Sequence, residues 1–169
     1  VTDDGRGRDE SGPQTRLSAA NQNPALKPRR ILAVDLGTKR VGLAISDPMG
    51  MFAQPDGYLP YKNRETLADE LKQIAAEKSV DLILVGLPTR DDGTHGKAAE
   101  NCKVIAETIR ARCGVELKFW DERYTTQEAE NILIGEMDMS RSKRKKNIDS
   151  MAACMILRSY MDSAEYKRG

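Results

Sequence analysis

Histidine and cysteine are scarce in this chain. His95 is the only histidine, and three cysteines lie far apart without a CxxC pair: Cys102, Cys113 and Cys154. This inventory excludes a zinc cage and a disulfide framework, so we expect a cytoplasmic protein with its cysteines in the core. It also argues against a Ser-His-Asp or Cys-His hydrolase, unless His95 is the base. Because His95 lies among turn residues, we expect it to be exposed or to contact substrate, and assign it no catalytic role.

Long apolar runs and a net charge are also missing. No apolar run approaches the roughly 20 residues that span a bilayer, so we expect no membrane contact. Hydrophobic residues make up 39% and charged residues 31% of the chain, a globular balance. Because 27 Lys and Arg oppose 26 Asp and Glu, any affinity for nucleic acid must come from local clustering of charge. A length of 169 residues suits one domain and is too short for two full catalytic lobes.

The first 28 residues differ in composition from the rest. They contain mainly Gly, Ser, Asn, Gln, Pro and charged residues, and they lack the apolar core of a secretion signal. Their four acidic residues count against an organelle transit peptide. We therefore predict a disordered tail at 1–28 and a folded domain at 29–169.

Three extended segments open the folded part. Residues 31–36 form an apolar run with one carboxylate, Asp35, and a glycine-containing turn follows at 37–40. Residues 41–46 alternate large apolar with small side chains, which indicates a second strand. A stretch from about 51 to 61 is interrupted by proline and glycine, so it predicts a third, irregular edge strand of an antiparallel meander.

Two helix–strand units follow the meander. Apolar residues recur at helical spacing over 67–75, before a strand at 80–85 that Gly86-Leu87-Pro88 ends. A second helix is predicted from about 98 to 113, where a glycine stops it, and a strand follows at 115–119. Three antiparallel strands and two helix–strand units together predict an α/β fold with a mixed five-stranded sheet flanked by helices.

The last third of the chain is less regular. Thr125 and Glu128 have the spacing of a capping box, which predicts the start of a short helix. Residues 135–146 are polar and basic, and we interpret them as a loop. A last helix is predicted from about Asn147, because apolar residues recur at helical spacing to Tyr160.

Three carboxylates occupy places where an acid is unexpected or well positioned. Asp35 lies inside an apolar strand, where a charge is costly unless it is paired or metal-bound. Glu122 follows the last strand, and Asp149 begins the last helix. Each has a plain structural explanation: Asp35 pairing with Lys39 or Arg40, Glu122 pairing with its neighbour Arg123, and Asp149 favoured by the helix dipole.

The three acids gain weight together. Ala152 and Ala153 lie on the helix face of Asp149, so small side chains would let that face approach the sheet near Asp35. Clustered carboxylates hold pairs of divalent ions that polarise a phosphodiester and activate water, and this chemistry needs no histidine. We therefore predict that Asp35, Glu122 and Asp149 are catalytic and bind Mg²⁺ or Mn²⁺.

Basic residues surround these acids in the sequence. A run ahead of Asp149 would place positive charge where a nucleic-acid backbone must lie, or would only be a solvated loop: Arg141, Lys143, Arg144, Lys145 and Lys146. Arg40 and Arg123 each neighbour a proposed ligand and either grip a phosphate or neutralise the acids in the free protein. We favour phosphate contact for both, for Lys39 and for residues 143–146.

Four blocks of residues carry a family resemblance, and they cover about 30–160. They are Asp35-Leu36-Gly37-Thr38-Lys39-Arg40-Val41-Gly42-Leu43-Ala44 with Ser46-Asp47-Pro48, Gly86-Leu87-Pro88 with Asp92-Gly93-Thr94, Asp121-Glu122-Arg123 with Thr125-Thr126, and Ile148-Asp149-Ser150 with Ala152-Ala153. In this order they resemble the YqgF/RuvX family. The resemblance implies an RNase H-like fold and a metal-dependent nuclease that matures the 5′ end of precursor 16S rRNA in ribosome biogenesis. It also implies that Asp35, Glu122 and Asp149 form the metal site.

Other functions remain open at this stage. The same residues could cut branched DNA as a Holliday junction resolvase, because phosphate contacts do not distinguish RNA from DNA. Residues 35–38 also resemble the phosphate loop of the actin and sugar-kinase superfamily, although the chain is too short for two lobes. A non-catalytic RNA-binding or transcription factor is a third possibility. We expect precursor 16S rRNA within the pre-ribosome as partner and, since no strong dimer interface is evident, a monomer or weak dimer.

Overall fold

The computed structural model describes residues 29–90, 92–124 and 141–168, and for 124, 141–149 and 168 it describes the backbone alone. In chain order the elements are β1 (Ile31–Leu36), β2 (Arg40–Ser46), β3 (Ala53–Pro60), α1 (Arg64–Glu77), β4 (Leu82–Leu87), α2 (Lys97–Cys113), β5 (Glu116–Asp121), the 3₁₀ turn η1 (Glu122–Tyr124), α4 (Arg141–Asp162) and α5 (Ala164–Arg168).

The five strands form one sheet in the order β3-β2-β1-β4-β5. β2 pairs antiparallel with β1 and with β3, whereas β4 pairs parallel with β1 and with β5. The predicted mixed five-stranded sheet is therefore confirmed. Since β1, β4 and β5 run parallel, their carboxyl ends meet at one edge of the sheet.

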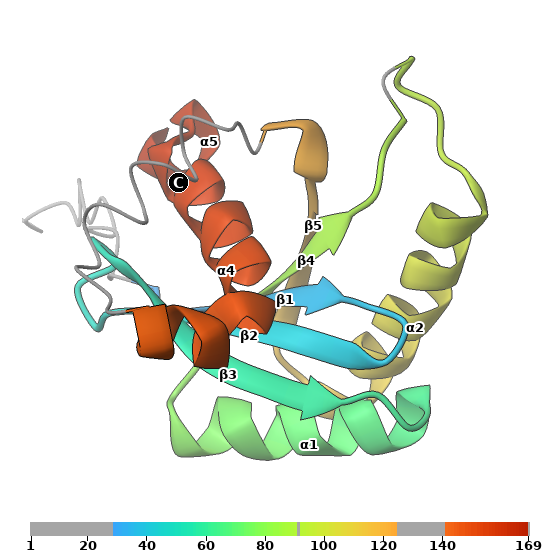
Figure 1. Ribbon diagram of the computed structural model, residues 1–169, viewed down its shortest axis with the longest axis horizontal. Coiled ribbons are helices and arrows are strands. Elements are labelled where there is room, and N and C mark those ends of the chain that lie inside the picture. The colour runs from blue at the N-terminus through green and yellow to red at the C-terminus, as the bar shows by residue number, and fades with distance from the viewer. Residues whose placement is uncertain (1–28, 91, 125–140, 169) are drawn as a thin grey trace, which may run out of the picture.

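Helices cover both faces of this sheet (Figure 1). Leu32 and Val34 of β1 pack with α1 and α2, whereas Ile31 and Ala33 pack with α4. The strand is thus buried on both sides, which explains its apolar run and makes a carboxylate in it unusual.

β3 is an irregular edge strand, as its sequence predicts. Its pairing with β2 shifts register between Gly42 and Ala44, and Gly57 has a positive φ of 82°. Pro55 lies in the strand because an edge position leaves a missing N–H without consequence.

α4 packs mainly on β2, β3 and β1, and side chains of β5 add contacts to it. The indole of Trp120 donates a hydrogen bond to the Ser159 hydroxyl at 3.0 Å, and its ring meets Tyr160 edge-on with 5.2 Å between centroids. Ala153 is fully buried against the sheet, so the prediction that small residues allow a close approach is confirmed at that position.

The last helix begins earlier than the sequence analysis predicted. α4 starts at Arg141, so the basic run is helical and not a loop, and Asp149 is the ninth residue of the helix, not a first-turn acid. Lysine and arginine are good helix formers, and a helix packed on the sheet extends through them at little cost. The predicted helix start at Thr125 lies outside the described residues.

Candidate functional site

Asp35 lies near the carboxyl end of β1. Side chains alternate along a strand, so Asp35 faces the same side as Ile31 and Ala33, the side covered by α4. Removal from water raises the pKa of its carboxyl group. No ion pair joins Asp35 to Lys39 or Arg40 in the described chain, so the structural explanation considered for this acid is not what the fold shows.

Glu122 comes to the same edge from β5, since it is the first residue of η1. Burial raises the pKa of its carboxyl group, and the negative charges of Asp35 and Asp121 raise it further. Two acids that lie far apart in the sequence are therefore neighbours in the fold. Their proximity follows from the topology, because parallel strands β1 and β5 end at the same edge.

Gly86 of β4 makes room between these strands. A Cβ atom at this position would lie 2.9 Å from Oε1 of Glu122 and 2.5 Å from Cδ1 of Ile156 in α4. The sequence predicts the end of a strand at Gly86, but this residue lies within β4. Its role is to let the Glu122 carboxylate and Ile156 of α4 approach the sheet, and the sequence pattern does not indicate this role for Gly86.

Cys102 supports the site from α2. Its thiol is buried and donates a hydrogen bond to the carbonyl oxygen of Gly86 at 3.4 Å. Burial raises the pKa of this thiol to about 11, and the charges of Glu122 and Asp35 act in the same direction. The thiol stays protonated at neutral pH, so Cys102 is a core residue, as predicted, and no thiolate ligand stands beside the acids.

For the third predicted acid, Asp149, the structure describes the backbone alone. Asp149 lies in α4, four residues before Ala153 and seven before Ile156, on the helical stripe that packs on the sheet. Its side chain lies outside what the structure describes. Among the described residues, no three His, Cys, Asp or Glu side chains form a group that could hold a metal ion.

The structure describes the side chains of only some of the basic residues that we predict to contact nucleic acid. Lys39 and Arg40 are exposed at the β1–β2 turn beside Asp35, and the Arg40 guanidinium lies 4.8 Å from the centroid of the Tyr58 ring. The side chains of Lys143, Arg144, Lys145 and Lys146 lie outside the described part of the chain.

Arg123 is held by the acid two residues before it. Its guanidinium donates to both carboxylate oxygens of Asp121, with Nη2 2.7 Å and Nε 3.0 Å from Oδ2. This pair lowers the pKa of Asp121 and keeps that acid charged next to Glu122. Arg123 therefore neutralises Asp121 in the free protein.

The loop between β4 and α2 lies beside Arg123. Asp92 accepts hydrogen bonds from the backbone N–H and the hydroxyl of Thr94, and a Cβ at Gly93 would lie 3.4 Å from Nη1 of Arg123. Arg90 packs on Gly96, where a Cβ would lie 3.0 Å from its Nη2. Arg90 is a further exposed cation at this edge, and nothing in its local sequence pattern distinguishes it. His95 in the same loop is exposed, as expected.

A family model matches most of the chain. The RuvX family model, described as Holliday junction resolvase, matches residues 29–163, more than half of the chain. The chain belongs to the RuvX family. Relatives in this family match it over nearly their whole length: a protein of Listeria monocytogenes serovar 1/2a is 46% identical over 136 residues, covering 79% of this chain and 98% of the relative. A Clostridium acetobutylicum protein is 42% identical over 134 residues, with 79% and 98% covered. Both carry the name "Putative pre-16S rRNA nuclease".

Solved structures confirm the RNase H-like class of the RuvX fold. Thermus thermophilus RuvC in complex with a Holliday junction substrate has a TM-score of 0.56 at 10% identity, covering 78% of this chain and 94% of that chain. The fowlpox virus Holliday junction resolvase has a TM-score of 0.51 at 17% identity, with 79% and 98% covered. At such identities the likeness concerns the fold alone. In the described part of the chain, no helix is both long and apolar enough to cross a membrane.

Proposed function

We propose that this chain is a metal-dependent endonuclease that hydrolyses phosphodiesters in the 5′-end maturation of precursor 16S rRNA. The observation that carries the proposal is the meeting of Asp35 and Glu122 at the carboxyl edge of the sheet, in a chain whose relatives are named for this activity. Residues 29–169 would form the nuclease domain, with 1–28 as a tail. Such an enzyme would work in the cytoplasm, as a monomer or weak dimer.

The donor groups fit Mg²⁺ or Mn²⁺. Both ions prefer oxygen ligands, and the site offers carboxylates while its thiol stays protonated. Two half-buried carboxylates close together are costly to ionise without a cation, so bound metal would relieve their repulsion. Asp35 and Glu122 would hold the metal, and Asp149 would complete the set from α4. Bound ions of this kind polarise the phosphodiester and lower the pKa of water.

The cations at the edge would position the RNA backbone. Lys39 and Arg40 lie where the chain turns from β1 into β2, close to Asp35 in the sequence. The basic residues 143–146 precede Asp149 in α4. The Arg40 guanidinium lies over the Tyr58 ring on an exposed residue, and its planar fork suits a bidentate phosphate contact. Arg123 would exchange Asp121 for phosphate, or would contact phosphate while it stays paired with Asp121.

Branched DNA is the second candidate substrate, because the family model carries the description of a Holliday junction resolvase. We favour RNA on the names of the relatives that match over nearly their full length. Symmetric cleavage of a junction also requires two active sites across a two-fold axis, and a single site suits one cut in one strand.

A side-by-side assay tests the proposal. Purified protein is incubated with precursor 16S rRNA and with a four-way DNA junction, each with Mg²⁺, with Mn²⁺ or with chelator. We expect metal-dependent cleavage near the mature 5′ end of the rRNA and weaker cleavage of the junction. Paired symmetric junction cuts with intact rRNA would support the resolvase, and RNA binding without cleavage in any buffer would indicate a binding module.

A further inference from the structure

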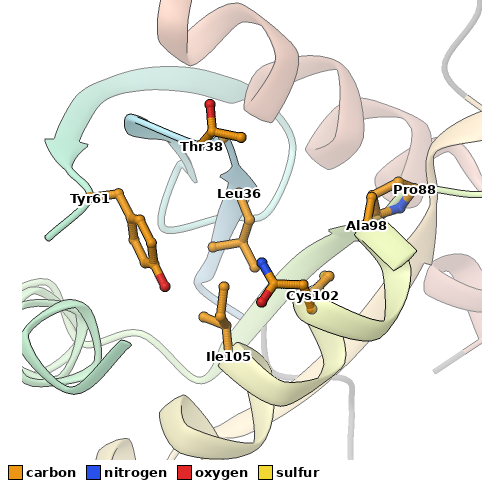
Figure 2. Close-up of a pocket in the computed structure, with 9 residues that line it drawn as sticks. Leu36, Thr38, Tyr61, Pro88, Ala98, Cys102 and Ile105 are labelled. Atoms are coloured by element: carbon orange, nitrogen blue, oxygen red, sulfur yellow. The ribbon is translucent and has the colours of Figure 1, made fainter. Parts of the chain in front are cut away.

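A cavity of about 260 Å³ opens on the α2 side of the sheet edge, next to the acids but across the end of β1 from them. Figure 2 shows the Tyr61 ring reaching from the segment after β3 toward Leu36 and Ile105, with α2 forming the opposite wall. Residues that line the cavity include Leu36, Thr38, Tyr61, Ala98, Asn101 and Cys102.

This cavity shares a wall with the proposed active site. Leu36 follows Asp35 in β1, and consecutive Cα atoms lie only about 3.8 Å apart. From α2, the Cys102 thiol donates a hydrogen bond to the carbonyl oxygen of Gly86. The Glu122 carboxylate lies next to the same glycine. A strand with one phosphate at Asp35 and Glu122 would therefore have a neighbouring nucleotide within reach of the cavity.

The chemistry of the walls selects an uncharged, flat group. No lining residue is charged, and most of the surface is aliphatic or aromatic. The polar groups are neutral: the Thr38 hydroxyl, the Asn101 amide and the Tyr61 hydroxyl, which forms no hydrogen bond with any residue in the described part of the chain. A phosphate here would find no cation in the lining, and the carboxylates of Asp35 and Glu122 lie near Cys102. A nucleobase offers two apolar faces and a hydrogen-bonding edge, which match this lining.

The size of the cavity supports a single base. Its volume is slightly below the roughly 300–1,000 Å³ typical of pockets for drug-sized ligands, so it suits one ring system and not a dinucleotide or a large cofactor. We propose that this cavity, the Tyr61 pocket, receives one unstacked base of the RNA next to the cleaved bond. The proposal deepens the proposed function and rests on it. It makes the enzyme selective for single-stranded or unpaired segments, because a base inside a duplex must first leave the stack.

Substrate variants test the pocket without altering the protein. Short single-stranded RNAs of one sequence are made with one abasic residue at each position in turn, and wild-type protein cleaves them with metal present. Loss of one stacked base lowers affinity by about 5- to 100-fold. We expect a loss of this size at one position beside the cut and little change at positions farther away. A uniform response along the RNA overturns the pocket.

Two alanines of α2 provide a matched pair of protein variants. Ala98 lines the pocket, and Ala111 is exposed on the same helix outside the lining. With chelator present, binding is followed by the fluorescence of 2-aminopurine placed at each RNA position. We expect one position to change its fluorescence strongly on binding to wild type and to A111F, and to lose that change in A98F with about 5- to 100-fold weaker binding.

The outcomes separate the two proposals. Cleavage by wild type that A98F and A111F affect equally overturns the pocket and leaves the nuclease standing. No RNA cleavage by wild type overturns both. If A98F lowers the melting temperature, N101A is used in its place, because Asn101 is exposed on α2 and its truncation leaves the core intact. Equal base preference of N101A and wild type then counts against the pocket.

Discussion

The carboxylate of Glu122 occupies the space that a side chain at position 86 would need. Its Oε1 atom lies 2.9 Å from the place of a Cβ on Gly86, closer than van der Waals contact permits. β4 thus contributes to the site by having no side chain there, and β1 and β5 contribute the acids on either side of it.

Replacing Gly86 tests this relationship. We expect G86A to lower the free energy of unfolding by about 1–3 kcal/mol, because the added methyl overpacks Ile156 and displaces Glu122. The measurement is denaturant unfolding of wild type, G86A, I156V and the double variant. I156V shortens the side chain that G86A meets, so the double variant should be more stable than the two single effects predict. Strict additivity would show that the two residues do not compete for space.

Replacing Asp35 tests the metal site. We expect D35N to lose at least about a hundredfold in cleavage rate, because the amide keeps the shape but not the anionic ligand. RNA binding measured in chelator should stay close to that of wild type. The control is D69N, which alters an exposed aspartate of α1 that pairs with Arg112 away from the site. D35N activity within tenfold of wild type would contradict the assignment.

The same variant predicts how stability depends on pH. Burial raises the pKa of Asp35 above its ordinary value of 3.8, so the unfolded chain ionises at lower pH than the folded protein. Below 3.8 both states hold the proton, and above the raised pKa the ionised carboxylate costs folding free energy. In chelator, D35N should therefore melt at a higher temperature than wild type at neutral pH. The difference should shrink as the pH falls toward 3.8.

Thermal unfolding across this pH range checks the sign. D69N serves again as the control, since its exposed carboxylate has no comparable burial. A melting temperature of D35N below that of wild type at neutral pH would indicate that Asp35 stabilises the fold through a pairing interaction.

The basic start of α4 predicts salt-dependent binding. Neutralising Lys143, Arg144, Lys145 and Lys146 together should weaken RNA binding, because fewer counterions are released from the RNA. The slope of log affinity against log salt should flatten by about 0.7 for each phosphate of a single strand that the variant no longer neutralises. K72Q on α1 should leave the slope unchanged. An unchanged slope in the fourfold variant would show that this run is only a solvated face.

Local patterns in the sequence were sufficient for the architecture. The apolar run of β1, the alternation in β2, the helical stripes of α1 and α2, and the glycine after Cys113 are each set by neighbouring residues. Gly114 does have the positive φ of 69° that ends a helix. Asp35 was recognisable because it interrupts an apolar strand, and Glu122 because it directly follows the end of a strand. Parallel strands then bring such ends together.

The tertiary structure alone decided how the site is built. Gly86, Cys102 and the Tyr61 pocket depend on packing between β4, α2 and the segment after β3, and no local period encodes such packing. Arg123 has acidic neighbours in the sequence, and only the side-chain geometry shows that it pairs with Asp121. Similarly, α4 begins at Arg141 because packing on the sheet stabilises a helix whose first residues lack an apolar stripe. Sequence periodicity determines which faces are buried, but which residues meet across those faces depends on the packing of the whole chain.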